Sequence, residues 1–237
     1  MNKYAIISNE VPIICDKLKE YGYKLIYTDC VDEFISYERC HADMQCTLID
    51  NKLFVLKECN HLQEELIKQD INFINTSDDC KGKYPDNIKL NVLFLSDKLV
   101  GKIDSIDSSI VDYCKENNID LIDVKQGYTA CSCTKISDKA IITADKSIYN
   151  TLKNTDIGVL LISPDGINLY GAKRGECGFI GGASVLLDDS NILFFGDITN
   201  HADYHNIKTF CTANKVNICY IEDIPLTDIG GCILLNF

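Results

Sequence analysis

No stretch of this 237-residue sequence approaches the roughly 18 continuous apolar residues that a helix needs to cross a bilayer. The first residues, Met1 to Tyr4, begin no signal-peptide pattern. Basic residues are scarce as well, since 23 Lys and Arg stand against 35 Asp and Glu, a net charge of −12. Nucleic-acid surfaces need clustered Lys and Arg. We therefore expect a cytoplasmic protein with no nucleic-acid partner and no membrane association, and a small cationic or neutral ligand fits its charge better.

Linkers rich in Pro, Gly or Ser are also missing between the segments of regular structure that the sequence predicts. Hydrophobic residues make up 46% of the chain and charged residues 24%, which is typical of an ordinary globular protein with a substantial core. The expected organisation is a single domain spanning residues 1–237.

The thirteen cysteines lack the paired C-x2-C spacings of a zinc site, because Cys131-Ser132-Cys133 is C-x-C with no companion pair. Their odd number and scattered positions argue against a disulfide framework, which belongs to small secreted chains. Most of them lie at apolar positions, where cysteine acts as a small hydrophobe. We expect no metal and no cofactor.

A repeated unit of helix, strand, loop and hairpin organises the chain, and its clearest copy ends in Val124–Asp145. Residues 107–117 predict a helix and residues 119–122 a strand. A loop at Lys125-Gln126-Gly127 follows. Alternation predicts a first hairpin strand over Tyr128–Ile136 and a short return strand over Ala140–Thr143, joined by a turn at residues 137–139.

The same hairpin recurs along the sequence. Its turn residues, Asn51, Asp97, Asp138 and Ser190, are separated by 46, 41 and 52 residues, which predicts five units. The fifth unit reaches Ile233–Leu235 and lacks a return strand, whereas Tyr4–Ile7 is a strand with no partner. We predict that these segments pair and close an α/β fold, a fivefold pseudo-symmetric β/α propeller whose N-terminal strand completes the fifth unit. The alternative is an open α/β sandwich with a mixed sheet, which the repeated hairpins make less favourable.

Chemistry is expected where the first hairpin strand enters each unit, because these entries occupy equivalent places around the axis. In the first unit, His41 and Asp43 are two residues apart on an expected strand and would share one face. A carboxylate beside an imidazole can orient it as a general acid or base. The alternative is a His and an Asp on a solvated strand edge.

A second group of candidates would bind substrate. Lys125, Gln126 and Tyr128, with the backbone of Gly181 and Gly182, are expected to line the same face as His41. Glycine lets a ligand approach the main chain closely, and it weakens a strand interior otherwise. A β-bulge with no pocket beside it is the alternative.

The expected fivefold propeller resembles the pentein superfamily of guanidine-modifying enzymes, which includes amidinotransferases, arginine and agmatine deiminases, and dimethylargininase. Two motifs add to this resemblance, His41-Ala42-Asp43 and Gly230-Gly231-Cys232. In that superfamily, His-x-Asp supplies the acid and base, and a Cys near the C-terminus attacks the guanidine carbon. The His-x-Asp motif falls late in those enzymes but in the first unit here. The phrases at residues 125–128, 178–184 and 196–198 also resemble an uncharacterised bacterial family of this fold.

The resemblance implies a hydrolase or transferase that acts on a guanidine or amidine carbon through a Cys thiolate, with His41 as acid and base and Asp43 orienting it. Cys232 is the favoured nucleophile by its place in the chain, although it begins an apolar strand. Cys131 is the substitute, because it follows a polar loop that contains Lys125. Either nucleophile should have a lowered pKa. The alternative function is a non-catalytic pentein-fold binding or interaction protein.

Overall fold

The computed structural model of the chain describes residues 2–173 and 176–236. Within these residues the strands form five three-stranded sheets of identical topology and one two-stranded sheet. In each three-stranded sheet the first strand pairs antiparallel with the second, and the second pairs parallel with the third. A helix connects the two parallel strands, as this topology requires. The predicted repeat of helix, strand and hairpin is therefore present.

The five three-stranded sheets follow one another along the chain. The first comprises β17 (Ile233–Asn236), β1 (Lys3–Ile7) and β2 (Lys24–Tyr27) with α1 (Pro12–Glu20). The second comprises β3 (Cys46–Ile49), β4 (Lys52–Val55) and β5 (Ile74–Asn75) with α3 (Asn60–Lys68). The third comprises β6 (Leu93–Leu95), β7 (Lys98–Gly101) and β8 (Asp120–Asp123) with α4 (Ser108–Glu116). The fourth comprises β9 (Cys133–Ser137), β10 (Ala140–Thr143) and β11 (Gly158–Leu161) with α6 (Lys146–Leu152). The fifth comprises β13 (Ser184–Asp188), β14 (Asn191–Phe194) and β15 (Asn217–Tyr220) with α7 (Tyr204–Ala213).

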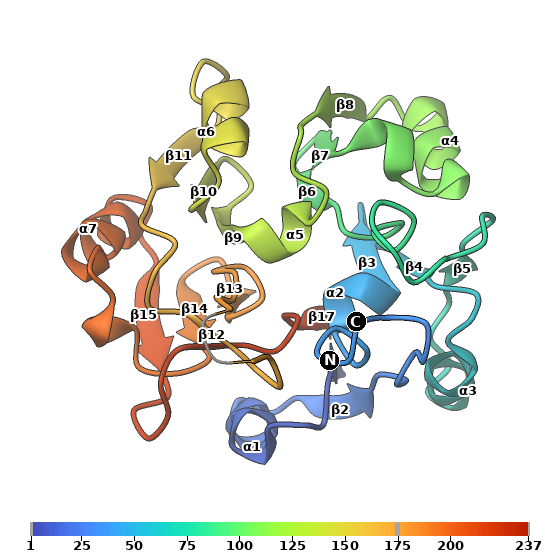
Figure 1. The fold of residues 1–237 in the computed structure, drawn as a ribbon, viewed down its shortest axis with the longest axis horizontal. Coiled ribbons are helices and arrows are strands. Elements are labelled where there is room, and N and C mark those ends of the chain that lie inside the picture. The colour runs from blue at the N-terminus through green and yellow to red at the C-terminus, as the bar shows by residue number, and fades with distance from the viewer. Residues whose placement is uncertain (1, 174–175, 237) are drawn as a thin grey trace.

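The two ends of the chain meet in the first sheet. β1 pairs antiparallel with β17, and Tyr4 lies opposite Leu235 while Ile6 lies opposite Ile233. This confirms the predicted pairing of the two terminal segments. Both strands bury apolar side chains, since Ile6 and Leu235 are almost inaccessible to solvent. Figure 1 shows the five sheets following one another around the molecule, with the first strand of each nearest the centre.

The helices that connect the parallel strands, α1, α3, α4, α6 and α7, lie on the outside of the sheets (Figure 1), and local sequence explains where several of them begin. Pro12 opens α1, where its missing N–H costs nothing. Asp107 and Asp145 cap α4 and α6, since the Asp107 carboxylate accepts one backbone N–H from the first turn and the Asp145 carboxylate accepts two. The hairpin turn between β3 and β4 has Asp50 and Asn51 at positive φ, which suits the residue types that tolerate this conformation. The predicted turn positions are therefore confirmed by turn chemistry as well as by spacing.

Two short helices were not predicted. α2 (Ala42–Gln45) and α5 (Thr129–Ser132) each form one turn immediately before the first strand of a sheet. The prediction of one continuous strand over Tyr128–Ile136 is therefore wrong at its start, because the Ser132 N–H donates to the Tyr128 carbonyl in a helical turn. The shared strand face of His41 and Asp43 is wrong for the same reason, since His41 is the N-cap of α2.

Further elements also lay beyond the predicted pattern. The two-stranded parallel sheet joins β12 (Asn168–Leu169) to β16 (Thr227–Asp228). Short 3₁₀ helices span Ile103–Ser105 and Ile198–Asn200. A disulfide joins Cys30 to Cys40, a single bond that the cysteine spacing did not predict.

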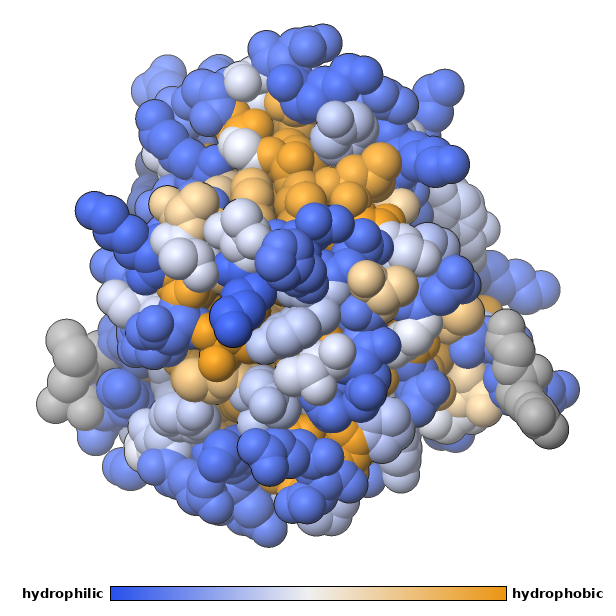
Figure 2. Space-filling view, turned by 90° about the vertical axis from the view of Figure 1, so that its left-hand side faces the viewer, coloured by the Kyte–Doolittle hydropathy of each residue, from blue (hydrophilic) through white to orange (hydrophobic). Residues whose placement is uncertain are grey.

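Charged and polar side chains cover most of the face shown in Figure 2, with hydrophobic side chains gathered in smaller areas between them. No helix within the described ranges has the length and apolar character needed to span a membrane.

Candidate active site

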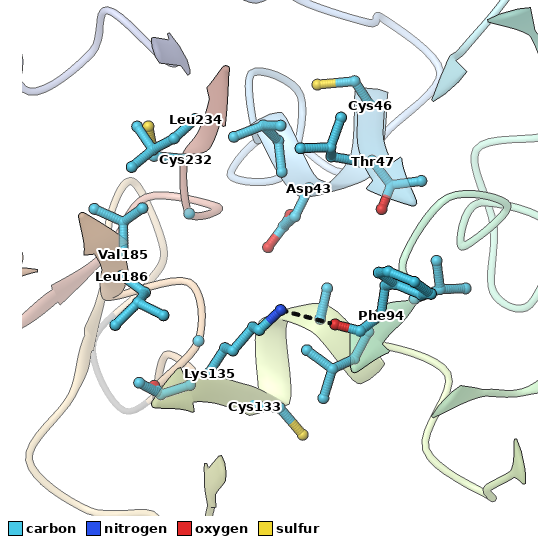
Figure 3. Close-up of a pocket in the computed structure, with 18 of the residues that line it drawn as sticks. Asp43, Cys46, Thr47, Phe94, Cys133, Lys135, Val185, Leu186, Cys232 and Leu234 are labelled. Carbon is cyan, nitrogen blue, oxygen red and sulfur yellow. Dashed lines mark hydrogen bonds between the residues drawn. The ribbon is translucent and has the colours of Figure 1, made fainter. Parts of the chain in front are cut away.

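A cavity of about 570 Å³ lies among the first strands of the five sheets. Residues from β3, β6, β9, β13 and β17 line it, and most are apolar, including Leu48, Phe94 and Leu186. Figure 3 shows the Asp43 carboxylate pointing into this space. Lys135 also points inward and donates a hydrogen bond to the Phe94 carbonyl at 3.3 Å.

Asp43 and Cys131 meet beside this cavity although they are far apart in the sequence. The helical turns α2 and α5 bring them together, and Cys131 Sγ is 2.9 Å from Asp43 Oδ2. Both side chains are almost fully buried, with exposed fractions of 5% and 3%. The Asp43 N–H donates to the Gly230 carbonyl at 3.0 Å, which fixes α2 against the loop before β17. The result is a buried thiol in direct contact with a buried carboxyl group.

Asn91 holds this pair in place. Its Nδ2 lies 3.0 Å from Cys131 Sγ and 3.2 Å from the Asp43 carbonyl oxygen, and its Oδ1 accepts the Cys131 N–H. Asn91 is 1% exposed, so water does not compete for these hydrogen bonds. Asn91 and Cys131 each stand two residues before the first strand of their sheets, which is why they arrive at the same place.

Asp228 supplies a second buried carboxyl group close to Asp43. Its oxygens accept the N–H groups of Phe179 at 2.7 Å and Gly230 at 2.9 Å. Gly182 packs so closely against this carboxyl group that any side chain there would overlap it. Asp228 belongs to β16, the short strand that the sequence pattern did not predict. We call Asp43, Asn91, Cys131 and Asp228 the carboxyl–thiol cluster.

Burial sets the protonation of the carboxyl–thiol cluster. It raises the pKa of Asp43 well above its usual value, and the nearby Asp228 charge adds to the effect. Burial also raises the pKa of Asp228 to about 6. The pKa of the Cys131 thiol is raised well above its usual value by burial, then by the charges of Asp43 and Asp228. Asp43 Oδ1 is buried and has no hydrogen-bond partner among residues 2–173 and 176–236, so the site has an acceptor that a cationic N–H donor would satisfy.

A third acidic side chain, Glu38, lies beside Tyr128. Asn87 Nδ2 and the Tyr128 hydroxyl donate to Glu38 Oε2 at 3.2 and 3.4 Å. Burial raises the pKa of Glu38, and these two hydrogen bonds act in the opposite direction. The Tyr128 ring stacks between Tyr84 and Phe179, with centroid distances of 5.8 and 6.1 Å. Tyr128, in the loop before the fourth sheet, therefore packs between the loop before the third sheet and the loop before the fifth sheet.

Of the four predicted catalytic residues, two belong to the carboxyl–thiol cluster and two, His41 and Cys232, lie outside it. Asp43 and Cys131 belong to the carboxyl–thiol cluster, and His41 is buried next to Gly230 at the start of α2. Cys232 lines the cavity but packs with the apolar cluster that includes Ala5 and Ile7. Burial raises the pKa of Cys232 well above its usual value, as it does for Cys131. The expectation of a lowered thiol pKa is therefore wrong for both cysteines, because burial disfavours the charged thiolate.

The predicted binding residues also lie in two different places, the glycines against Cys131 and the others in the loop before α5. Gly181 and Gly182 donate their N–H groups to the Cys131 carbonyl at 2.8 and 3.1 Å, so they support the cluster through its backbone. Gln126 Nε2 donates to Asp145, and Gln126 Oε1 accepts the Tyr128 N–H. Lys125 is exposed in the same loop. Sequence reasoning missed Glu38, Asn91 and Asp228, of which only Asn91 carried a usable signal through its place before a first strand.

His41 should make folding stability depend on pH in a defined direction. Burial lowers its pKa from 6.5 to about 4. The unfolded chain therefore binds a proton between these values that the folded chain does not, so stability is complete above pH 6.5 and falls as the pH decreases towards 4. Relative to His41→Gln, the wild type should lose about 3 kcal/mol over this range. Urea unfolding at several pH values measures the difference, and the exposed His61→Gln is the control. A constant difference would contradict a buried neutral His41.

Sequence comparison places the chain among known families. A model described as a family of unknown function (DUF6873) matches residues 6–233. No curated protein matches the sequence.

Comparison with solved structures finds the same fold in guanidine-modifying enzymes. The C. jejuni agmatine deiminase matches with a TM-score of 0.54 at 9% identity, covering 98% of this chain and 92% of the enzyme. A Cys-to-Ser mutant of DDAH from Pseudomonas aeruginosa, complexed with citrulline, matches with a TM-score of 0.55 at 8% identity, covering 94% and 92%. SxtG, an amidinotransferase from Microseira wollei in the saxitoxin biosynthetic pathway, matches with a TM-score of 0.55 at 9% identity, covering 89% and 76%. These likenesses show a mixed α/β fold of the pentein type, which the sequence had indicated.

Proposed function

The chain belongs to the family of unknown function DUF6873, and from this membership and its pentein-type fold we propose that it is a hydrolase or transferase acting on a guanidine or amidine carbon. The observation that carries the proposal is the contact of 2.9 Å between Cys131 Sγ and Asp43 Oδ2, next to the unpartnered Asp43 Oδ1. Cys131 is the nucleophile and Asp43 binds the substrate cation and moves the proton. The closed fivefold propeller, with its five sheets as blades, is part of the same proposal.

Substrate binding would start the reaction, because without a cation nearby the proton stays on the thiol. The raised pKa values of Cys131 and Asp43 favour their uncharged forms. A guanidinium or amidinium cation within a few ångströms lowers both pKa values, since it stabilises the thiolate and the carboxylate. A small cation is therefore the ligand that the cluster favours, and a neutral ligand lacks this effect.

The covalent steps follow from the contacts. The Cys131 thiol gives its proton to Asp43 Oδ2, and the sulfur forms a bond to the central carbon of the substrate. The tetrahedral adduct loses an amine, which leaves with a proton from Asp43. Water then adds to the same carbon and loses a proton, the carbon–sulfur bond breaks, and the sulfur takes up that proton from His41, which restores the thiol and releases a urea or an amide. If an amine replaces water, the reaction is a transfer instead. His41, uncharged at neutral pH, is the proposed acceptor of the water proton.

A non-catalytic binding protein is the second candidate, and the raised thiol pKa of Cys131 is the observation that favours it. In that case the unpartnered Asp43 oxygen would hold a cationic ligand without covalent chemistry. The two candidates differ in one property, the reactivity of Cys131 towards a bound cation.

Alkylation with two reagents tests this difference. A haloacetamidine carries an amidinium group, whereas iodoacetamide is neutral and of similar size. We expect the amidinium reagent to label Cys131 at least roughly tenfold faster than the neutral one, because the carboxyl groups attract the cation and ionise the thiol. The exposed Cys177 is the internal control for the general attraction of cations to an acidic protein. Equal reagent preference at Cys131 and Cys177 would argue against a cation site at Cys131.

A further inference from the structure

The disulfide between Cys30 and Cys40 closes a loop that carries Glu38. Neither helix nor strand lies between Tyr27 and Ala42, so this loop depends on individual contacts for its shape. The Val31 N–H donates to the Arg39 carbonyl, and the Thr28 hydroxyl donates to the Cys40 carbonyl. The covalent bond therefore ties the two sides of the loop next to His41, the residue that follows Cys40.

Other contacts hold the ends of the loop independently of the disulfide. Gln45 binds the backbone of Asp29 and the carbonyl of Arg39. The Asp29 carboxylate accepts the N–H groups of His61 and Leu62 at the start of α3. Breaking the disulfide would therefore leave the loop ends in place and loosen the segment between them, which includes Glu38.

Glu38 connects this loop to the candidate active site. Its carboxylate takes hydrogen bonds from Asn87 and Tyr128, which stand at the entries of the third and fourth sheets. Two residues past Cys40, α2 begins and presents Asp43 to Cys131. A loosened loop segment thus reaches the site through Glu38, whereas the loop end that leads into α2 keeps its place through Gln45.

One sulfur of the disulfide is accessible to solvent, and the bond occurs in a chain whose other described cysteines are free thiols. Cys30 is exposed, whereas Cys40 is 5% exposed. The eleven other cysteines, all within the described residues, are free thiols. A chain rich in free thiols suits a reducing compartment, where a disulfide is usually transient and redox-sensing.

We propose that the Cys30–Cys40 disulfide is a redox switch that controls the candidate active site through the Glu38 loop. The proposal rests on the proposed function for its catalytic consequence. A cellular dithiol is the co-reactant. Its thiolate attacks the exposed Cys30 sulfur, Cys40 leaves as a thiolate that takes up a proton, and the second thiol of the reductant releases Cys30. Two electrons pass from the dithiol to the protein, and the dithiol becomes a disulfide. The oxidised protein is the active form.

The experiment compares the oxidised protein, the protein reduced with dithiothreitol, and Cys30→Ser. Two quantities are measured in each, the rate of product release from a guanidine and the rate of Cys131 alkylation by iodoacetamide. Reduction and Cys30→Ser should each lower product release roughly tenfold, because small displacements of positioning groups cost about this much or more. Both should raise the alkylation rate of Cys131 several-fold. Cys177→Ser, which removes an exposed free thiol outside residues 30–40, should respond to dithiothreitol as the wild type does.

Two further results separate the alternatives. Glu38→Gln should lower product release in the oxidised protein and remove most of the difference between the redox states, since the loop acts through this carboxylate. If product release and Cys131 alkylation are the same in oxidised and reduced protein, the switch is overturned while the proposed function stands. If no guanidine is converted in either state, the proposed function fails, and the alkylation rates alone decide whether the loop controls access to Cys131.

Discussion

Replacing Cys131 with alanine is expected to lower the release of ammonia or amine from a guanidine substrate by roughly 10³-fold or more, as loss of a covalent nucleophile does. The sulfur stands 2.9 Å from Asp43 Oδ2 and 3.0 Å from Asn91 Nδ2, and the described residues offer no second thiol in this cluster. Steady-state release from a panel of guanidines and amidines measures the effect. Circular dichroism and thermal unfolding should show a folded variant, with stability changed by about 1 kcal/mol.

Cys232→Ser is the matched control for this experiment. Cys232 follows the Gly230-Gly231 pair, lines the cavity and occupies the chain position that the pentein resemblance favours for the nucleophile. It packs, however, with the apolar cluster that the first and fifth sheets share. The variant should therefore retain most of the activity. Loss of activity in Cys232→Ser with activity retained in Cys131→Ala would reverse the assignment.

Asp43→Asn should lower activity by roughly 10²- to 10⁴-fold, because it removes both the proton acceptor and the charge that binds the cation. The same change should increase stability at neutral pH. Burial raises the Asp43 pKa in the folded protein, so the folded state binds more protons than the unfolded state above the ordinary value of 3.8. Stability therefore falls as the pH rises through that window, and asparagine avoids the loss. We expect a gain of roughly 1 kcal/mol at pH 7.

Paired activity and urea-unfolding measurements across pH 4 to 8 test this trade-off. The control is Asp50→Asn, a change of the same size at an exposed position of the hairpin turn that borders the cavity. That variant should keep its activity and its pH dependence. A functional carboxyl group kept at the expense of stability is a mark of an active site. If Asp43→Asn were less stable than the wild type at pH 7 and still active, Asp43 would be a structural residue.

The fold could be predicted because its signals are local and repeated. Alternating apolar residues and turn residues such as Asn51 mark each hairpin, and their spacing gives the number of units. The pairing of β1 with β17 followed from counting strands, since an unpaired strand at each end has the other as its available partner. The single helical turns α2 and α5 could not be predicted, because four residues are too few to show a helical period.

The site was only partly predictable for a different reason. His41, Asp43 and Cys131 carry chemistry that draws attention in any sequence. Glu38 and Asp228 are ordinary acidic residues in a chain with 35 of them, and only burial distinguishes the two. The Cys30–Cys40 bond was hidden in the same way, among thirteen cysteines whose spacing shows no pairing. Tertiary structure, which brings the entry loops together, decides which of these residues meet.

The most direct test is to search by mass spectrometry for a substrate fragment bound to the protein during turnover. The central claim is that Cys131 forms a bond to the guanidine or amidine carbon, so the reaction is quenched in acid and the peptides are analysed by mass spectrometry. We expect a covalent amidino group on the peptide that contains Cys131, present with substrate and absent in Cys131→Ala. Such a group on Cys232, or product formation with no modified cysteine at any time after mixing, would contradict it.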